Sequence, residues 1–138
     1  MRTFGVLGLA VLAMAASVAS SAGDDTATQI EIYRIAPGQQ VPFLKLIALY
    51  DEANEAAGLP PRQLYVHQDG ASWDFVIIQS AEDWTDEQRS KFRAALTRLG
   101  APQGQAFFLE IRKFIAEHTD TVATGPTTAG KWLKSLEQ

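Results

Sequence analysis

Cysteine is absent from the 138 residues of this sequence. The chain therefore forms no disulfide bonds, has no thiolate metal site and carries no thiol nucleophile. Cysteine-free exported proteins are ordinary in a bacterial periplasm and less usual among small eukaryotic secreted domains.

Positive charge is also scarce, because 12 Lys and Arg residues stand against 16 Asp and Glu, which gives a formal net charge of −4. Proteins that bind nucleic acid or anionic membrane surfaces need clustered basic residues. We therefore expect no nucleic-acid partner, and no membrane attachment of the mature form.

Long apolar runs are limited to one, close to the N-terminus. Phe4 to Ala16 carries no charge, follows the basic start at Arg2, and precedes a row of small residues from Ser17 to Ala22. This pattern is typical of a secretory signal peptide, and the run is shorter than the ~20 residues of a transmembrane span.

The mature chain follows from that pattern. We predict a signal peptide over residues 1–22, with cleavage after Ala19 or Ala22, and a single domain over residues 23–138 that is periplasmic or secreted.

The hydrophobic periodicity of the first two thirds predicts an alternation of strands and helices. Apolar residues recur at every second position in some segments and at helical spacing in others, and Gly and Pro separate these segments. In chain order, the expected elements are a strand at 29–35, a helix at 41–57, strands at 62–67 and 73–79, and a helix that begins at a Thr85 capping box.

The C-terminal third is more ambiguous. We expect a helix over Gln103 to His118, although a strand through Phe107 and Ile111 fits part of the same stretch. Residues 119–130 have the composition of a loop, and Thr128 can cap a short final helix. The predicted fold is thus α+β, with a ferredoxin-like β-α-β-β-α core and a mostly helical C-terminal third in which a fourth strand is not evident.

Residues 29–99, with their strand, helix, hairpin and helix, resemble the dimeric α/β-barrel superfamily. The resemblance is architectural, and no motif of defined chemistry accompanies it. It implies two sheets that pair face to face and enclose a pocket. Members of the superfamily include small monooxygenases without a prosthetic group and haem-handling enzymes.

Candidate ligand-binding residues lie first on the predicted strands. Tyr65 and His67 share the strand face opposite Leu64 and Val66, and we expect Tyr33 on that same free face. Aromatic side chains line pockets for apolar ligands, and an imidazole serves as a base, a ligand or a haem axial group. These residue types also fill ordinary cores and dimer interfaces.

His118 and Asp120 form a second candidate group in the polar run from Glu117 to Thr121. On a helix, His118 shares the inward stripe with Ile111, while Glu117 and Asp120 point elsewhere. A metal site needs three or four converging ligands, so we expect a structural histidine here, and neither a metal nor a cofactor.

The sequence therefore predicts an exported, homodimeric protein that binds a small molecule and has the dimeric α/β-barrel architecture. Two alternatives stay open. One is a cofactor-independent oxygenase or haem-handling enzyme on the same scaffold, and the other is a protein-interaction module.

Overall fold

The computed structural model describes residues 26–70 and 72–137. The signal peptide expected over residues 1–22 lies outside these residues. The described elements are, in chain order, β1 (Ala27–Ile35), α1 (Gln40–Ala56), β2 (Gln63–Val66), β3 (Phe75–Ser80), α2 (Asp86–Arg98), α3 (Gln105–Ile111), β4 (Ile115–Thr124) and α4 (Ala129–Ser135).

The strands form a four-stranded sheet in the order β2-β3-β1-β4, and every neighbouring pair is antiparallel. A β-α-β-β-α-β chain arranged in this way is ferredoxin-like, which confirms the predicted fold class. The strands, α1 and the capped α2 lie close to their expected positions.

The C-terminal third differs from the expectation in one respect. Its helices α3 and α4 are present, but the helix predicted over Gln103 to His118 ends at Ile111, and the chain then forms β4 from Ile115. A fourth strand that the sequence does not make evident thus completes the sheet at the edge next to β1, where it makes the most extensive contacts between any two elements.

Pairing of β1 with β4 contains one irregularity. Ile35 pairs with Ile115, but Arg34 pairs with Glu117, so Ala116 is an extra residue on β4. This is a β-bulge, in which two residues of one strand oppose one residue of the other.

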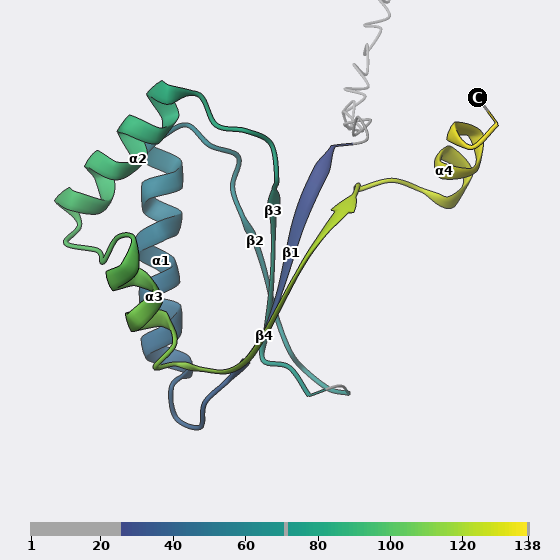
Figure 1. Cartoon of the computed structure of the whole chain (residues 1–138). Helices are drawn as coiled ribbons and strands as arrows, with labels where there is room; N and C mark the ends of the chain where they lie inside the picture. The colour runs from purple at the N-terminus through teal and green to yellow at the C-terminus, as the bar shows by residue number, and fades with distance from the viewer. Residues whose placement is uncertain (1–25, 71, 138) are drawn as a thin grey trace, which may run out of the picture.

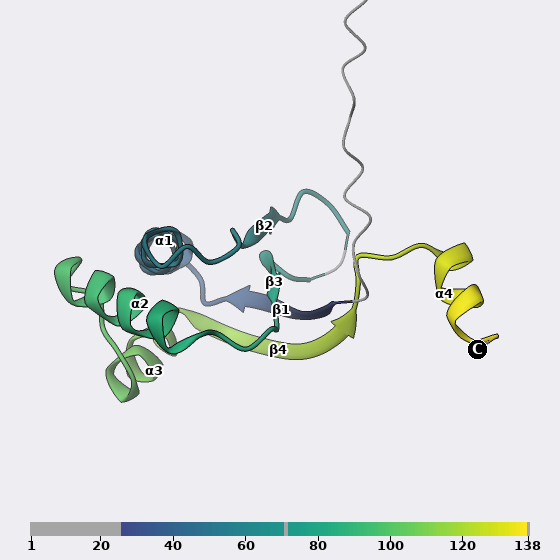
Figure 2. The ribbon, with the colours of Figure 1, turned by 90° about the horizontal axis from the view of Figure 1, so that it is seen from above.

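Helices α1, α2 and α3 cover one face of the sheet, and no helix of the described residues covers the other, which is called the open face below (Figures 1 and 2). The main core lies beneath the helices, where the Phe43 ring is fully buried and stacks on Phe75 with 5.4 Å between ring centroids. Phe43 also packs against Tyr33, with 4.9 Å between the centroids. Burial of three aromatic side chains at one point fixes α1 on the sheet.

A second cluster joins α1 to α2 through Ala53, Ala95 and Leu96. The capping box at the start of α2 forms as the sequence predicts. The Thr85 hydroxyl accepts a hydrogen bond from the Gln88 backbone N–H at 3.1 Å, and the Thr85 backbone N–H donates to the Gln88 side chain at 2.9 Å.

Helix α4 lies apart from the other helices, on the side of the open sheet face (Figures 1 and 2). Thr128 caps it as expected, because its hydroxyl accepts a hydrogen bond from the Lys131 backbone N–H. Its apolar side chains, Trp132, Leu133 and Leu136, are exposed. Among the described residues, no helix is both long enough and apolar enough to cross a membrane.

Candidate functional site

A cavity of about 680 Å³ lies between the helix-covered face of the sheet and helices α1 and α3. Its volume falls in the range of small-molecule sites. One wall comes from the helices and is mostly apolar, and the other comes from β1 and β4 and is mostly polar.

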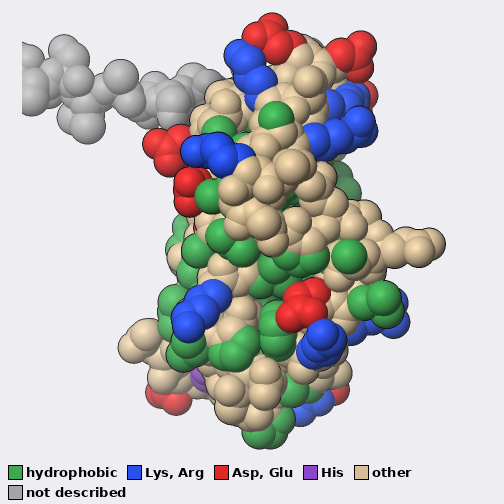
Figure 3. Space-filling view, turned by 90° about the vertical axis from the view of Figure 1, so that its left-hand side faces the viewer, with side chains coloured by type: hydrophobic (Ala, Val, Ile, Leu, Met, Phe, Trp, Pro, Cys, Tyr) green, Lys and Arg blue, Asp and Glu red, His purple; other side chains and the backbone are tan. Residues whose placement is uncertain are grey.

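The apolar wall consists of Ile47 and Tyr50 from α1 and of Phe107, Phe108 and Ile111 from α3. The rings of Tyr50 and Phe107 pack together, with 4.6 Å between their centroids, and the Tyr50 hydroxyl donates a hydrogen bond to the Pro102 carbonyl. The Phe108 side chain is largely exposed at the rim. On the helix side of the molecule, hydrophobic side chains reach the surface between scattered charged ones (Figure 3).

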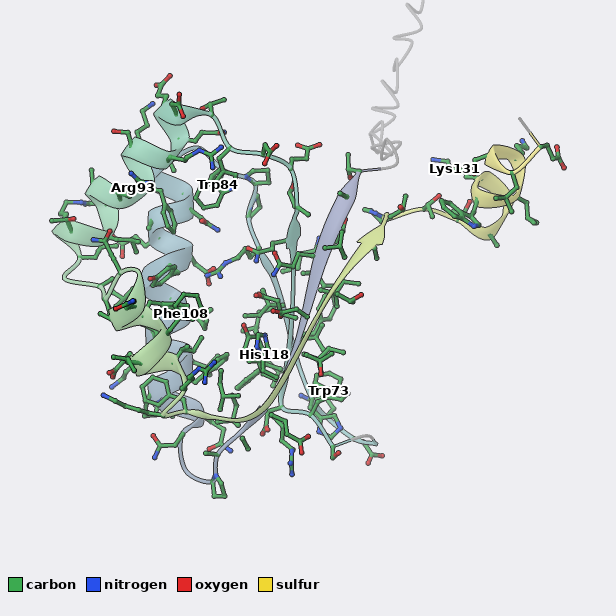
Figure 4. The ribbon with its side chains drawn as sticks, in the orientation of Figure 1. Trp73, Trp84, Arg93, Phe108, His118 and Lys131 are labelled. Carbon is green, nitrogen blue, oxygen red and sulfur yellow. The ribbon has the colours of Figure 1, made fainter. Side chains whose placement is uncertain are left out.

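The polar wall follows from the register of β1 and β4. Tyr33 pairs directly with His118, and Glu31 pairs directly with Asp120. Directly paired residues of antiparallel strands point to the same face of the sheet. Figure 4 shows His118 on the helix side of the sheet, with Phe108 on α3 across from it.

His118 is held from two directions. Its ring stacks on that of Tyr33, with 4.4 Å between centroids and an interplanar angle of 10°. Its Nε2 atom lies 2.6 Å from Oδ1 of Asp120. The expected placement of His118 on a helical stripe is wrong, because the segment is a strand, and it is the alternation of a strand that brings Asp120 to the same face.

Glu31 completes this wall and is its most buried carboxylate. Its oxygens accept hydrogen bonds from the side-chain amides of Gln29 at 3.3 Å and Gln79 at 3.4 Å. Burial raises the pKa of Glu31 above its usual value, and the negative charge of Asp120 raises it further. The site therefore disfavours the bare negative charge of Glu31, and a proton or a cation relieves this cost.

Tyr33 keeps its phenolic proton at neutral pH. Burial raises the pKa of Tyr33 well above its ordinary value of 10, and the neighbouring Glu31 raises it further. The expectation that Tyr33 lies on the free face is wrong, because it is buried under Phe43 on the helix-covered face.

Besides Arg112, which also lines the cavity, Arg62 brings positive charge to this region. Its guanidinium contacts the Asp51 carboxylate at 2.5 Å and donates a hydrogen bond to the Ile47 carbonyl at 3.2 Å. Only 11% of its side chain is exposed, and it lines the cavity. Its charge lowers the pKa of Glu31, although less than burial and Asp120 raise it.

The two remaining sequence candidates lie on the open face. Tyr65 is half exposed and borders a separate hollow of about 310 Å³ with Ile30 and Ile78. The His67 ring packs against Trp73 at 4.9 Å, and its buried Nε2 atom has no hydrogen-bond partner among the described residues. The structure thus brings Tyr33, His118 and Asp120 together and separates them from Tyr65 and His67.

The sequence reading missed Glu31 and Arg62. A signal for Glu31 exists, because the alternation from Gln29 to Tyr33 puts Glu31 on the same strand face as Tyr33. A charged residue on a strand face that also carries a large aromatic side chain indicates either the edge of the core or a functional site. Arg62 has no comparable signal, since it lies in the loop before β2.

Comparison with known proteins finds no matching family model and no matching curated protein. Solved structures do match. A NIPSNAP family protein from Agrobacterium tumefaciens strain C58 is similar at 20% identity, over 75% of this chain and 95% of its own, with a TM-score of 0.46.

Two other solved structures show how different the matching proteins are. SnoaB from Streptomyces nogalater, a cofactor-independent oxygenase, is similar at 20% identity over 77% of this chain and 98% of its own, with a TM-score of 0.46. A dimeric protein of unknown function and ferredoxin-like fold from Bacteroides fragilis is similar at 10% identity over 74% of this chain and 98% of its own, with a TM-score of 0.42. These likenesses concern the fold alone. The fold that the described residues adopt is the ferredoxin-like one.

Proposed function

We propose that this protein binds a flat, apolar or aromatic small molecule that carries one hydrogen-bond donor. The observation that carries the proposal is the cavity of about 680 Å³ with an apolar wall on the helices and a polar wall on the sheet. Such a combination of aromatic surface and a few converging polar groups is typical of small-molecule sites.

The charges of the polar wall select the polar group of the ligand. Glu31 and Asp120 present carboxylate oxygens, and Asp51 and the Ile47 carbonyl engage Arg62. A hydroxyl or amine donates a hydrogen bond to such a wall, whereas an anionic group meets like charge. The ligand class is therefore a neutral phenol, alcohol or amine on an apolar body.

Binding of 1-naphthol, measured by isothermal titration calorimetry, tests this proposal. We expect 1-naphthol to bind in the cavity and 1-naphthoic acid, an anion at neutral pH, to bind at least about tenfold more weakly. Phe108→Ala removes a rim ring that is already largely exposed, so it should weaken 1-naphthol binding without unfolding the protein. Leu109→Ala, at an exposed neighbour of Phe108 on α3 that does not line the cavity, is the matched control. Equal binding of the two naphthalenes, or equal effects of the two variants, contradicts the proposal.

An enzymatic role is the second candidate, and the His118–Asp120 pair favours it. A carboxylate at 2.6 Å from an imidazole is the arrangement that orients a general base. One protein of similar fold, SnoaB, is a cofactor-independent oxygenase. Oxygen consumption in the presence of 1-naphthol, lost in His118→Ala, would support catalysis, and a Soret band after addition of haemin would support haem handling instead.

We also propose a homodimer that forms through the open sheet face. That face carries exposed or half-exposed apolar side chains, among them Ile30, Ile32, Tyr65, Val76 and Ile78, and a second copy would remove them from water. Sedimentation equilibrium should give twice the mass of one chain, and Ile32→Lys should return it to a monomer. A monomer of the unmodified protein at high micromolar concentration contradicts the dimer, and a dimer without any bound ligand favours the interaction module.

Export completes the proposal. Its support is the sequence pattern of residues 1–22. N-terminal sequencing of protein recovered from the periplasm or the medium should begin near Gly23 or Ser20. A soluble cytoplasmic form that retains Met1 contradicts export.

A further inference from the structure

Three side chains of metal-ligand type converge on the polar wall of the cavity. Glu31 comes from β1, while His118 and Asp120 come from β4, and each offers one ligand atom within 4.8 Å of the others. Antiparallel pairing places them, because Glu31 lies directly opposite Asp120 and His118 is two residues away on the same strand face. The ligands therefore come from regular strands that lie next to one another.

A cation in direct contact with Glu31 is the partner that this arrangement lacks, because Arg62 is engaged by Asp51 and acts on Glu31 only through its charge. Within the part of the chain that the structure describes, no Lys or Arg forms a salt bridge with Glu31. Its carboxylate accepts two long hydrogen bonds from amides, and a hydrogen bond from the Tyr33 side chain lowers its pKa. Asp120 brings a second negative charge close to it. Two carboxylates that share a site repel each other unless a proton or a cation lies between them.

We propose that Glu31, His118 and Asp120 bind one divalent transition-metal ion, such as Zn²⁺. One imidazole and two carboxylates suit Zn²⁺, whose catalytic sites have three protein ligands and leave a fourth position open. In a tetrahedral site, ligand atoms at 2.0–2.2 Å from a common ion lie about 3.4 Å apart. The ligand atoms here lie within 4.8 Å of one another. Rotations of the two exposed side chains, His118 and Asp120, toward the half-buried Glu31 would bring them to that spacing, with the His118–Asp120 contact exchanged for bonds to the ion.

The fourth position of such an ion would face the cavity, since all three ligands line it. A hydroxyl or amine of a bound molecule could then coordinate the ion. The metal site stands independently of ligand binding, because its three side chains and their register do not depend on what fills the apolar part of the cavity.

Titration of the chelator-treated full chain with Zn²⁺ tests the proposal, with a second titration by Co²⁺ followed through its visible absorption. We expect one equivalent of Zn²⁺ per chain. Glu31→Gln and Asp120→Asn should each weaken Zn²⁺ binding at least about tenfold and change the Co²⁺ spectrum. Glu117→Gln is the matched control, because this residue is the neighbour of His118 on the same strand and its carboxylate pairs with Arg34 on the opposite face. His67→Asn controls for the other histidine.

Circular dichroism of each metal-free variant shows whether it is folded. No saturable Zn²⁺ binding by the folded wild type overturns the proposal, as does an equal loss of affinity in Glu31→Gln and Glu117→Gln. Binding that is lost in His67→Asn but not in Asp120→Asn also overturns it. Titration of 1-naphthol in the presence of the chelator measures the proposed small-molecule site separately, so failure of one proposal is distinguishable from failure of the other.

Discussion

Replacement of His118 by alanine separates the packing role of this residue from its chemical role. The variant loses the ring that stacks on Tyr33 at 4.4 Å, and an aromatic pair of this kind contributes about 0.5–1.5 kcal/mol. It also loses the contact with Asp120, whose side chain is 51% exposed, and such a half-exposed pair contributes at most about 1 kcal/mol. We expect His118→Ala to lower the free energy of unfolding by about 1–2 kcal/mol.

In a domain of this size, that loss lowers the melting temperature by roughly 4–10 °C. Thermal unfolding of the metal-free protein, followed by circular dichroism, measures it. His118→Phe is the informative companion, because a phenyl ring keeps the stack on Tyr33 but removes the nitrogen atoms. It should melt within a few degrees of wild type and still lose the binding of Zn²⁺.

A wild-type melting temperature for His118→Ala would contradict this packing role, since the stack would then contribute nothing. The packing role is also refuted if His118→Phe is as unstable as His118→Ala. Thr119→Ala, on the opposite face of the same exposed strand, serves as the control and should change the melting temperature little.

Three further substitutions test the scaffold. Phe43→Ala should cost about 3–5 kcal/mol in urea unfolding, because it removes a fully buried ring from between two others; a cost below 1 kcal/mol contradicts this core. Thr85→Ala should cost about 1 kcal/mol by loss of the cap on the Gln88 N–H, and Thr85→Ser should restore most of it. Tyr50→Phe should cost about 0.5–1.5 kcal/mol through its lost hydrogen bond to Pro102. Burial raises the pKa of Tyr50 above 10, so the unfolded chain ionises first and wild-type stability falls as pH rises above 10; the fall should be shallower in Tyr50→Phe.

Local sequence patterns were sufficient to predict most of the helices and strands. The exception is β4, and it has a physical cause. The apolar residues from Phe107 to Ile115 fit a helical stripe, yet the helix ends at Ile111 and the strand starts at Ile115. The stripe therefore spans two elements. Most residues of β4 beyond Ile115 are exposed, so this edge strand shows no alternation of apolar and polar residues, which is the usual sequence signal of a strand.

The candidate site was predictable only in part, for a related reason. Tyr33, His118 and Asp120 were identified by their residue types, but their convergence depends on the pairing of β1 with β4, across more than 80 residues of sequence. No local pattern specifies that pairing. Tyr33 and Tyr65 lie on opposite faces of the sheet, and this placement depends in the same way on which face the helices cover.

The β-bulge at Ala116 sets the phase of everything that follows it on β4. Side chains on a strand alternate, so a shift of one residue exchanges the two faces of the strand. If Ala116 were kept but paired with Arg34, so that the strand continued without a bulge, Glu117 would come opposite Tyr33 and His118 opposite Ile32, and both His118 and Asp120 would point to the open face. The sheet could retain its hydrogen bonds while the cavity lost half of its polar wall. The bulge therefore keeps the site in phase. Deletion of Ala116 would leave His118 opposite Tyr33, whereas regular pairing that retains Ala116 would preserve the fold and turn the polar wall away from the cavity.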